Sequence, residues 1–343
     1  MSNTTPGMVC AHHHLYSSLA RGMPAPPSTP TSFLGVLEQI WWRLDQALDL
    51  EMIRASALLG ALEALESGTT AIIDHHESPS AIEGSLSVIA QACAEVGVRV
   101  MCAYGITDRH GPDGAAAGLN ENRRFLAEGG RGYVGVHAAF TCSDDSLEQA
   151  ASLAAEFGTG VHIHVAEGPD DREAHLRLQQ LSTSDWLLIH AVHLPTDHGL
   201  AGTIVHNPRS NMNNAVGYAD PTRFPESQPV ALGTDGIGAD MLEEFRLAYC
   251  RHRESNLAAT PDAAWNWLST GWNLVPEALN DHVRWSYDQV DNPWAAAFTP
   301  GVAAQEVRID GEILLLEGKP TRVDPLEIRA KAKEQAQRLF AKL

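Results

Sequence analysis

The sequence is poor in positive charge and almost without lysine. It carries 24 Lys and Arg against 43 Asp and Glu, and its formal net charge is −19. Its only lysines are Lys319, Lys331, Lys333 and Lys342. A chain this negative is repelled at long range by nucleic-acid backbone and by anionic membrane surfaces. We therefore expect no nucleic-acid or membrane partner, and a small molecule as the substrate.

Cysteine is scarce, and long apolar runs are absent. The five cysteines form an odd set with no C-x-x-C spacing, which is typical of reduced thiols rather than of a disulfide framework. No run approaches the ~18 uninterrupted apolar residues of a membrane-spanning helix. The start, MSNTTPGM, lacks a basic segment followed by an apolar one. We therefore expect a cytoplasmic protein.

The sequence does show a regular alternation of strand-like and helix-like segments. With 343 residues, 44% of them hydrophobic, the chain can bury a sizeable core. Eight short apolar runs bounded by turn residues predict strands, and most gaps carry helical sequence. The runs are 8–14, 70–75, 98–105, 133–140, 160–167, 186–192, 203–208 and 229–235. This order predicts an α/β fold, a closed (β/α)8 TIM-type barrel, with an open doubly wound sheet as the alternative.

Polar residues gather at the carboxyl ends of the predicted strands, where barrels of this kind place their active sites. Any single histidine there is more readily explained as a buried core residue, but seven strand ends together favour a site. The residues are His12, His14, Asp74, His75, His137, His164, Glu167, His190, His206 and Asp235.

Near the start, the stretch PGMVCAHHHLYSSLARG contains a His-x-His pair. Side chains alternate along a strand, so His12 and His14 point to one face. With His164 and Asp235 they would give three imidazoles and a carboxylate, a zinc-type ligand set that leaves a position open for water. Reactive groups on neighbouring strand ends favour a catalytic over a structural metal.

The remaining segments predict a wall and a second domain. The long connection after the first strand, with Trp41 and Trp42, is either a lid or substrate wall or a helix docked on the barrel. Asp145 and Glu148 are expected to cap the helix that follows the fourth strand. Residues 306–318 predict a hairpin turning at Asp310 and Gly311, followed by a closing helix that Asp324 caps. We expect a barrel domain over 6–280 and a C-terminal domain over 281–343.

Several motifs together resemble a known family. PGMVCAHHHLYSSLARG, HVAE, HAVHL, VHNPRSNMNNAVG and LGTDG resemble, in order and spacing, the amidohydrolase superfamily, in the branch of cytosine deaminase, guanine deaminase and the chlorohydrolases. IWWRLDQAL and IDHHESPSAIEGSL look most similar to its SsnA group of aminohydrolases. The resemblance implies His12, His14, His164 and Asp235 as metal ligands, with Glu167 and His190 as catalytic groups beside them.

The implied chemistry is hydrolysis by a metal-activated water. In it Asp235 accepts the proton of the water, His190 orients the water or stabilises charge, and Glu167 protonates a nitrogen of the substrate. The expected reaction is deamination of a purine, pyrimidine, pterin or triazine. A dechlorinating hydrolase or an inactive metal-binding homologue is the alternative. Candidate substrate contacts are His137, His206, Asn207, Arg109 and Trp41.

Two further expectations follow from comparison with this family. Its two-metal members are commonly bridged by a carboxylated lysine on the fourth strand, where this chain has His137. One metal is therefore expected, zinc first and ferrous iron as the alternative.

Family members also begin with strands before the PG motif, where this sequence has only MSNTT. We expect either a start assigned too late or a truncated β-sandwich remnant. The C-terminal hairpin is then expected to expose an edge and to promote a homodimer or aggregation.

Overall fold

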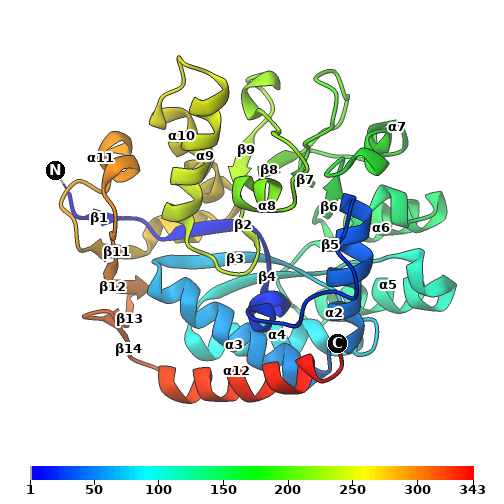
Figure 1. The fold of residues 1–343 in the computed structure, drawn as a ribbon, viewed down its shortest axis with the longest axis horizontal. Coiled ribbons are helices and arrows are strands. Elements are labelled where there is room, and N and C mark those ends of the chain that lie inside the picture. The colour runs from blue at the N-terminus through cyan, green and yellow to red at the C-terminus, as the bar shows by residue number, and fades with distance from the viewer. Residues whose placement is uncertain (1) are drawn as a thin grey trace.

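The computed structural model of the chain, which describes residues 2–343, consists of a ring of parallel strands surrounded by helices, with a small antiparallel sheet at one side (Figure 1). All eight predicted strands are present, and the TIM-type barrel is confirmed. In chain order they are β2 (Met8–His14), β3 (Thr69–His76), β4 (Arg99–Tyr104), β5 (Val134–Ala138), β6 (Val161–Val165), β7 (Leu187–His190), β8 (Thr203–His206) and β9 (Val230–Leu232).

The ring is closed at two seams between its three-strand and five-strand halves. At one seam, parallel bridges join Cys102 to Gly132 and Ile106 to Val136, which links β4 to β5. At the other, the short strand β10 (Asp235–Gly236) pairs in parallel with β2, opposite His13 and His14. The second seam therefore brings Asp235 beside the His-x-His pair.

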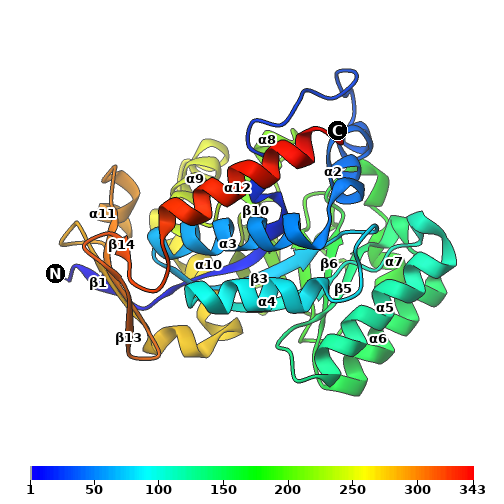
Figure 2. The ribbon, with the colours of Figure 1, turned by 90° about the horizontal axis from the view of Figure 1, so that it is seen from below.

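Helices pack around the ring (Figures 1 and 2). They are α3 (Leu50–Glu66), α4 (Ser85–Val96), α5 (Gly111–Ala127), α6 (Asp144–Phe157), α7 (Ala174–Leu178), α8 (Pro208–Asn213), α9 (Met241–Ser255) and α10 (Pro261–Leu274). The predicted cap of α6 is wrong. Ser143 is the N-cap, and its hydroxyl accepts a hydrogen bond from the Ser146 amide, which leaves Asp145 inside the first turn.

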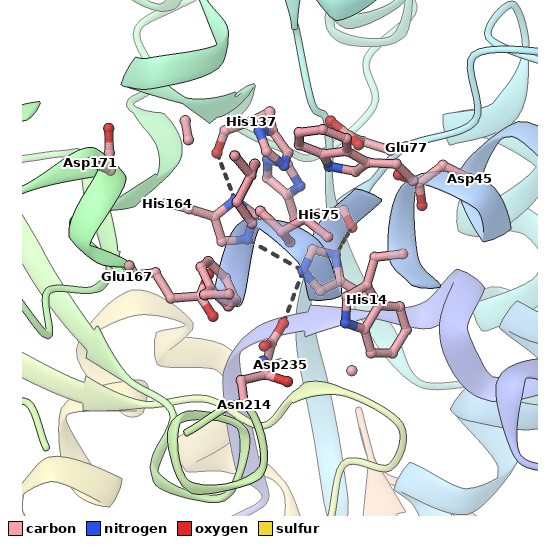
Figure 3. Close-up of a pocket in the computed structure, with 18 of the residues that line it drawn as sticks. His14, Asp45, His75, Glu77, His137, His164, Glu167, Asp171, Asn214 and Asp235 are labelled. Carbon is pink, nitrogen blue, oxygen red and sulfur yellow. Dashed lines mark hydrogen bonds and ion pairs between the residues drawn. The ribbon is translucent and has the colours of Figure 1, made fainter. Parts of the chain in front are cut away.

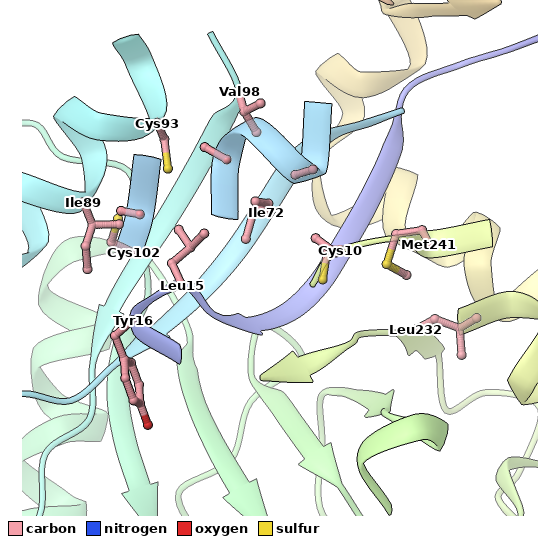
Figure 4. Close-up of a cluster of buried hydrophobic side chains, with 14 of the residues drawn as sticks. Cys10, Leu15, Tyr16, Ile72, Ile89, Cys93, Val98, Cys102, Leu232 and Met241 are labelled. Carbon is pink, nitrogen blue, oxygen red and sulfur yellow. The ribbon is translucent and has the colours of Figure 1, made fainter. Parts of the chain in front are cut away.

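The core lies between the strands and these helices (Figure 4). Cys10 on β2, Ile72 on β3 and Cys102 on β4 are wholly buried, as are Ile89 and Cys93 on α4. All five cysteines are free thiols. The strands are thus apolar on their outer faces, and the polar strand ends project into the interior of the ring.

The small sheet has five strands in the order β1-β11-β12-β13-β14. They are β1 (Thr4–Thr5), β11 (His282–Trp285), β12 (Ala304–Ile309), β13 (Glu312–Leu316) and β14 (Lys319–Pro320). The predicted hairpin of β12 and β13 is confirmed, with Asp310 at φ 51° and Gly311 at φ 84°, the left-handed pair of a tight hairpin turn.

The predicted exposed edge of this hairpin is wrong. β11 pairs with β12 on one side, and β14 pairs with β13 on the other. Beyond β11 lies β1, and the Trp285 indole donates to the Thr5 hydroxyl at 2.9 Å. The homodimer stays a prediction, but an exposed hairpin edge no longer supports it.

The connection between β2 and β3 folds into short helical pieces beside the barrel mouth. It contains a 3-10 turn (Leu15–Ala20), α1 (Phe33–Val36), a π-helical turn (Leu37–Trp41) and α2 (Trp42–Ala47). The closing helix α12 (Pro325–Phe340) is capped by Asp324 as predicted and packs along α3. Lys342 Nζ donates to the Ala47 carbonyl at 2.8 Å, so the last residues reach α2.

The shorter elements complete the chain. They are 3-10 turns at Asp108–His110, Ala139–Thr141, Pro169–Asp171, Pro221–Arg223 and Pro276–Asn280, and the helix α11 (Pro293–Phe298). Within residues 2–343 there is no helix whose length and apolar character would let it span a membrane.

Candidate metal centre and active site

Four predicted ligands meet at the carboxyl ends of β2 and β6 and at β10. Figure 3 shows three of them, His14, His164 and Asp235. One ligand atom from each of His12, His14, His164 and Asp235 lies within 4.8 Å of all the others. His14 Nε2 is 3.0 Å from Asp235 Oδ1 and 3.3 Å from His164 Nε2, and His12 Nε2 is 3.3 Å from the same carboxylate oxygen. A tetrahedral metal with bonds of ~2.0–2.1 Å separates its ligand atoms by ~3.3 Å. The spacing therefore suits one metal ion.

Hydrogen bonds at the outer ring nitrogens fix which nitrogen faces the centre. His14 Nδ1 lies 2.6 Å from the His75 carbonyl, and His164 Nδ1 lies 2.6 Å from the His137 carbonyl. A carbonyl only accepts, so both rings carry their proton on Nδ1 and keep the Nε2 lone pair. Two such lone pairs facing each other at 3.3 Å repel, and a cation between or beside them removes this repulsion. The donor set thus fits a divalent metal.

The pKa values of the rings agree with this conclusion. Burial lowers the pKa of His12 to about 3, which keeps the ring neutral and free to coordinate. Burial also opposes a charge on His14, but the hydrogen bond and negative charge of Asp235 outweigh it and raise the pKa of His14. The negative charge of Asp235 therefore favours a positive charge among the ligand atoms of this centre.

His12 has a different outer partner, which the sequence did not lead us to predict. Its Nδ1 lies 2.8 Å from Nε2 of His162, a residue with no exposed surface. His162 stands two residues before His164, in the His-x-His of GVHIHVAE, and that repeat of the first motif was the available signal. An imidazole rather than a carbonyl orients this ligand.

Glu167 and His190 lie beside Asp235. His190 Nε2 is 3.5 Å from Glu167 Oε2 and 3.8 Å from Asp235 Oδ2, and its Nδ1 is 2.8 Å from the Asn211 side-chain oxygen. Burial and the nearby charge of Asp235 raise the pKa of Glu167 well above its usual range. A carboxyl with a raised pKa holds its proton more readily and is suited to act as an acid.

Two of these residues have a strained backbone. His190 has φ 71° and Asp235 has φ 59°, the left-handed region that costs a non-glycine residue of order 1–3 kcal/mol. Ser210 donates its hydroxyl to Asp235 Oδ2, which helps to hold that residue. Backbone strain is common at functional sites, because there the required position of a side chain outweighs the cost of an unfavourable φ.

The metal centre opens into a cavity with about 800 Å³ of empty space, its mouth included. Phe33, Leu37, Trp41 and Trp42 from the β2–β3 connection line one side of it. The structure thus supports the reading of this connection as a substrate wall. A π-helical turn within it, Leu37–Trp41, is of a kind often found at functional sites.

Of the five predicted substrate contacts, His137 and Trp41 line the cavity and three residues do not. Arg109 is held by Glu77, with its guanidinium 4.2 Å from the centre of the Trp42 ring. Asn207 is buried, with its side-chain nitrogen 3.4 Å from His190 Nδ1. His206 is also buried, between the rings of Tyr218 and Trp267.

For Arg109, Asn207 and His206 we correct the expectation of direct contact to one of support. Each side chain is occupied by protein neighbours, and none belongs to the cavity lining. The sequence predicted these residues near the mouth of the barrel, but it could not show whether their side chains face the cavity or the surrounding protein.

The whole chain can be compared with known proteins. The model of the amidohydrolase family matches residues 3–270. The chain belongs to the amidohydrolase family. The resemblance predicted from the sequence motifs is thereby confirmed.

Curated relatives of this amidohydrolase are named as deaminases. It is 28% identical to a 5'-deoxyadenosine deaminase of Methanopyrus kandleri, over 97% of this chain and 86% of that one. It is also 28% identical to a 5-methylthioadenosine/S-adenosylhomocysteine deaminase of Syntrophomonas wolfei, over 98% and 87%. The predicted enzyme class, a hydrolase acting on C–N bonds other than peptide bonds, agrees with these names.

Solved structures share the fold of this amidohydrolase. A zinc-bound adenosine deaminase of Xanthomonas campestris matches with a TM-score of 0.83 and 20% identity, over 98% of this chain and 86% of that one. The zinc complex of atrazine chlorohydrolase from Arthrobacter aurescens matches with a TM-score of 0.79 and 19% identity, over 97% and 88%.

Proposed function

We propose that this amidohydrolase is a one-metal aminohydrolase that replaces the amino group of a nitrogen heterocycle with oxygen, and that adenine nucleosides are its substrates. The observation that carries the proposal is the convergence of His12, His14, His164 and Asp235, of which all but His12 line the cavity, with Glu167 beside them. The deaminase names of the relatives support the adenine ring as the substrate core.

The metal is proposed to be zinc, with ferrous iron as the alternative. Three imidazoles and a carboxylate suit both ions. Residues 1–318 contain no lysine that could bridge a second metal after carboxylation. Elemental analysis of the purified active protein is expected to give one metal per chain, and two tightly held metals per chain would contradict this.

The residues of the chain divide the proton transfers between them. A divalent metal bound by the four ligands would supply an acidified water as the nucleophile. Asp235 Oδ1 lies among the ligand nitrogens, which leaves Oδ2, on the His190 side, to take a proton from that water. His190, held at Nδ1 by Asn211, orients the water and stabilises charge at the attacked carbon.

Glu167 completes the reaction as the acid. It delivers its proton to the ring nitrogen next to the attacked carbon, and the proton that Asp235 took from the water passes to the amino group, which leaves as ammonia. As the carbon–oxygen double bond forms, the remaining hydroxyl proton returns to Glu167 and restores the acid. Trp41 and His137, which line the cavity, are proposed to contact the ring of the substrate. The balance is one water consumed and one ammonia released for each amino group replaced by oxygen.

A substrate panel tests the proposed function. Zinc-loaded protein is incubated with adenine nucleosides, pyrimidines, pterins and chlorinated triazines, and both ammonia and chloride are assayed. Ammonia from the adenine nucleosides is the expected result. Chloride release would favour the dechlorinating alternative, and no product from the whole panel would favour an inactive metal-binding homologue. We further propose a small-molecule substrate and a cytoplasmic location. We also propose that the protein is a homodimer, which a measurement of its size in solution tests.

A further inference from the structure

Apart from four histidines, the described residues that line the cavity include acids but no basic side chain. Six carboxyl groups line it, those of Asp45, Glu77, Glu167, Asp170, Asp171 and Asp235, whereas no lysine or arginine does. Glu167 and Asp235 belong to the metal centre. Asp171 accepts hydrogen bonds from the Phe140 and Ala166 amides, and Asp170 is exposed at the mouth. Asp45 and Glu77 remain to be explained.

Asp45 and Glu77 form, with Trp42, a polar wall that we call the carboxyl wall. The Asp45 and Glu77 side chains are only 2% and 4% exposed, yet Asp45 Oδ1 and Glu77 Oε1 have no hydrogen-bond partner. The Trp42 indole nitrogen also has none. Buried polar atoms without partners cost free energy, so their survival on a cavity wall indicates a ligand that satisfies them.

One buried cation stands behind the carboxyl wall. Arg109 Nη2 is 2.5 Å from Glu77 Oε2 and 3.9 Å from Asp45 Oδ2. Although burial opposes ionisation, this guanidinium lowers the pKa of Glu77 to about 2. Burial and the charge of Glu77 raise the pKa of Asp45 well above its usual range, with Tyr16 as its further neighbour. Arg109 thus pairs closely with Glu77, and Asp45 is left without a close cation of its own.

We propose that the carboxyl wall is a subsite for a cationic nitrogen group of the ligand, an ammonium or an amidinium, and that it rejects anionic groups. This inference deepens the proposed function, because it concerns the same cavity and names the charge of the substrate. The free oxygens of Asp45 and Glu77 accept from the cation, and the Trp42 indole donates to a neighbouring acceptor atom. A phosphate or carboxylate would face the two carboxyl groups with no lysine or arginine on the cavity wall to pair it.

Binding of three phenyl probes tests the subsite without requiring turnover. Benzamidine, benzamide and benzenesulfonate share the phenyl ring and carry head groups with charges of plus one, zero and minus one. Their dissociation constants are measured by calorimetry on the zinc-loaded protein. Because charge-assisted hydrogen bonds are the stronger ones, benzamidine is expected to bind about tenfold tighter than the other two. Its binding should also release a proton from Asp45, seen as a heat that depends on the buffer.

Two variants locate the effect. Asp45→Asn keeps the Arg109–Glu77 pair and should reduce the preference for benzamidine to about twofold, with no proton release. Glu77→Gln should also reduce the preference for benzamidine, provided that the variant folds. Its melting temperature shows whether it does. Glu156→Gln, which removes an exposed carboxylate paired with Arg123, is the matched control and should leave the preference intact.

Three outcomes would overturn the subsite: no binding of benzamidine, benzenesulfonate binding as tightly as benzamidine, or a preference that Asp45→Asn leaves unchanged. A subsite that passes while the substrate panel yields neither ammonia nor chloride would instead count against the proposed reaction. The two failures are therefore distinguishable. If both hold, 5'-amino-5'-deoxyadenosine should be deaminated with a kcat/KM at least tenfold above that of adenosine 5'-monophosphate.

Discussion

The two ends of the cavity are built in different ways. The metal centre uses residues at the ends of barrel strands, where the strand direction and the neighbouring strands fix each side chain. The carboxyl wall uses the β2–β3 connection and the loop after β3, and a buried arginine holds it together. Rigid strand ends suit the part that performs the chemistry, whereas a connection can change between relatives without disturbing the barrel.

The largest expected effect breaks the metal centre itself. His164→Ala removes one of the four ligands, so the protein should lose its metal and all measurable turnover together. Metal content by elemental analysis and ammonia release are measured on one preparation. A variant that keeps full metal content would show that His164 is not a ligand.

The next effect separates the acid from the ligands. Glu167→Gln keeps the size of the side chain but removes the proton, so kcat should fall by about two to four orders of magnitude with metal content unchanged. If Glu167 only supports the loop after β6, the melting temperature should drop while kcat stays near that of the wild type. Both quantities are measured on the same sample.

A smaller effect tests the imidazole behind His12. His162→Phe removes the acceptor at 2.8 Å from His12 Nδ1, and loss of such a partner typically weakens metal binding by 10- to 100-fold. Competition with a zinc chelator measures the affinity. His162→Gln restores an acceptor oxygen and should recover part of it. The control is His76→Phe, a buried histidine bonded to Ser78, which should leave zinc affinity unchanged.

The smallest effect on turnover is expected for His206, outside the cavity lining. His206→Phe should leave kcat within about twofold, since its ring packs between two aromatic rings. A loss of a hundredfold or more would return His206 to the set of substrate contacts.

The same variant has a pH signature. Burial lowers the pKa of His206 to about 3, whereas the unfolded chain takes up the proton near pH 6.5. The unfolded state therefore binds more protons between these values, and the free energy of unfolding falls as the pH drops through this window. Between pH 6.5 and 5 the wild type should lose about 2 kcal/mol more than His206→Phe. Urea unfolding at the two pH values measures the difference, and equal losses would contradict a buried neutral ring.

The cluster of proposed metal ligands was predictable from sequence because its residues follow from strand periodicity. His12 and His14 share a face by alternation, and the order of strands around a closed barrel brings Asp235 next to them. His162 was not predicted, although His164, two residues later in the same His-x-His, was.

The carboxyl wall was not predictable in the same way. Which side of Trp42 faces the cavity depends on how a π-helical turn places α2, and no periodic pattern encodes that turn. Arg109 was expected to touch substrate. Its position behind Glu77 depends on tertiary packing, which no local sequence pattern predicts. The exposed hairpin edge was wrongly expected because Thr4–Thr5 and His282–Trp285 are too short to read as strands.

The contact of the C-terminal residues with α2 has a practical side. Lys342 and Leu343 bond to Ala47 and Arg43 on the segment that carries Trp42. An affinity tag fused after Leu343 would start against the back of the substrate wall, and cleavage by a carboxypeptidase would remove its clasp. A tag before Ser2 lies beside the small sheet and leaves that wall undisturbed. The position of the tag therefore determines whether the assays measure an enzyme with an intact substrate wall.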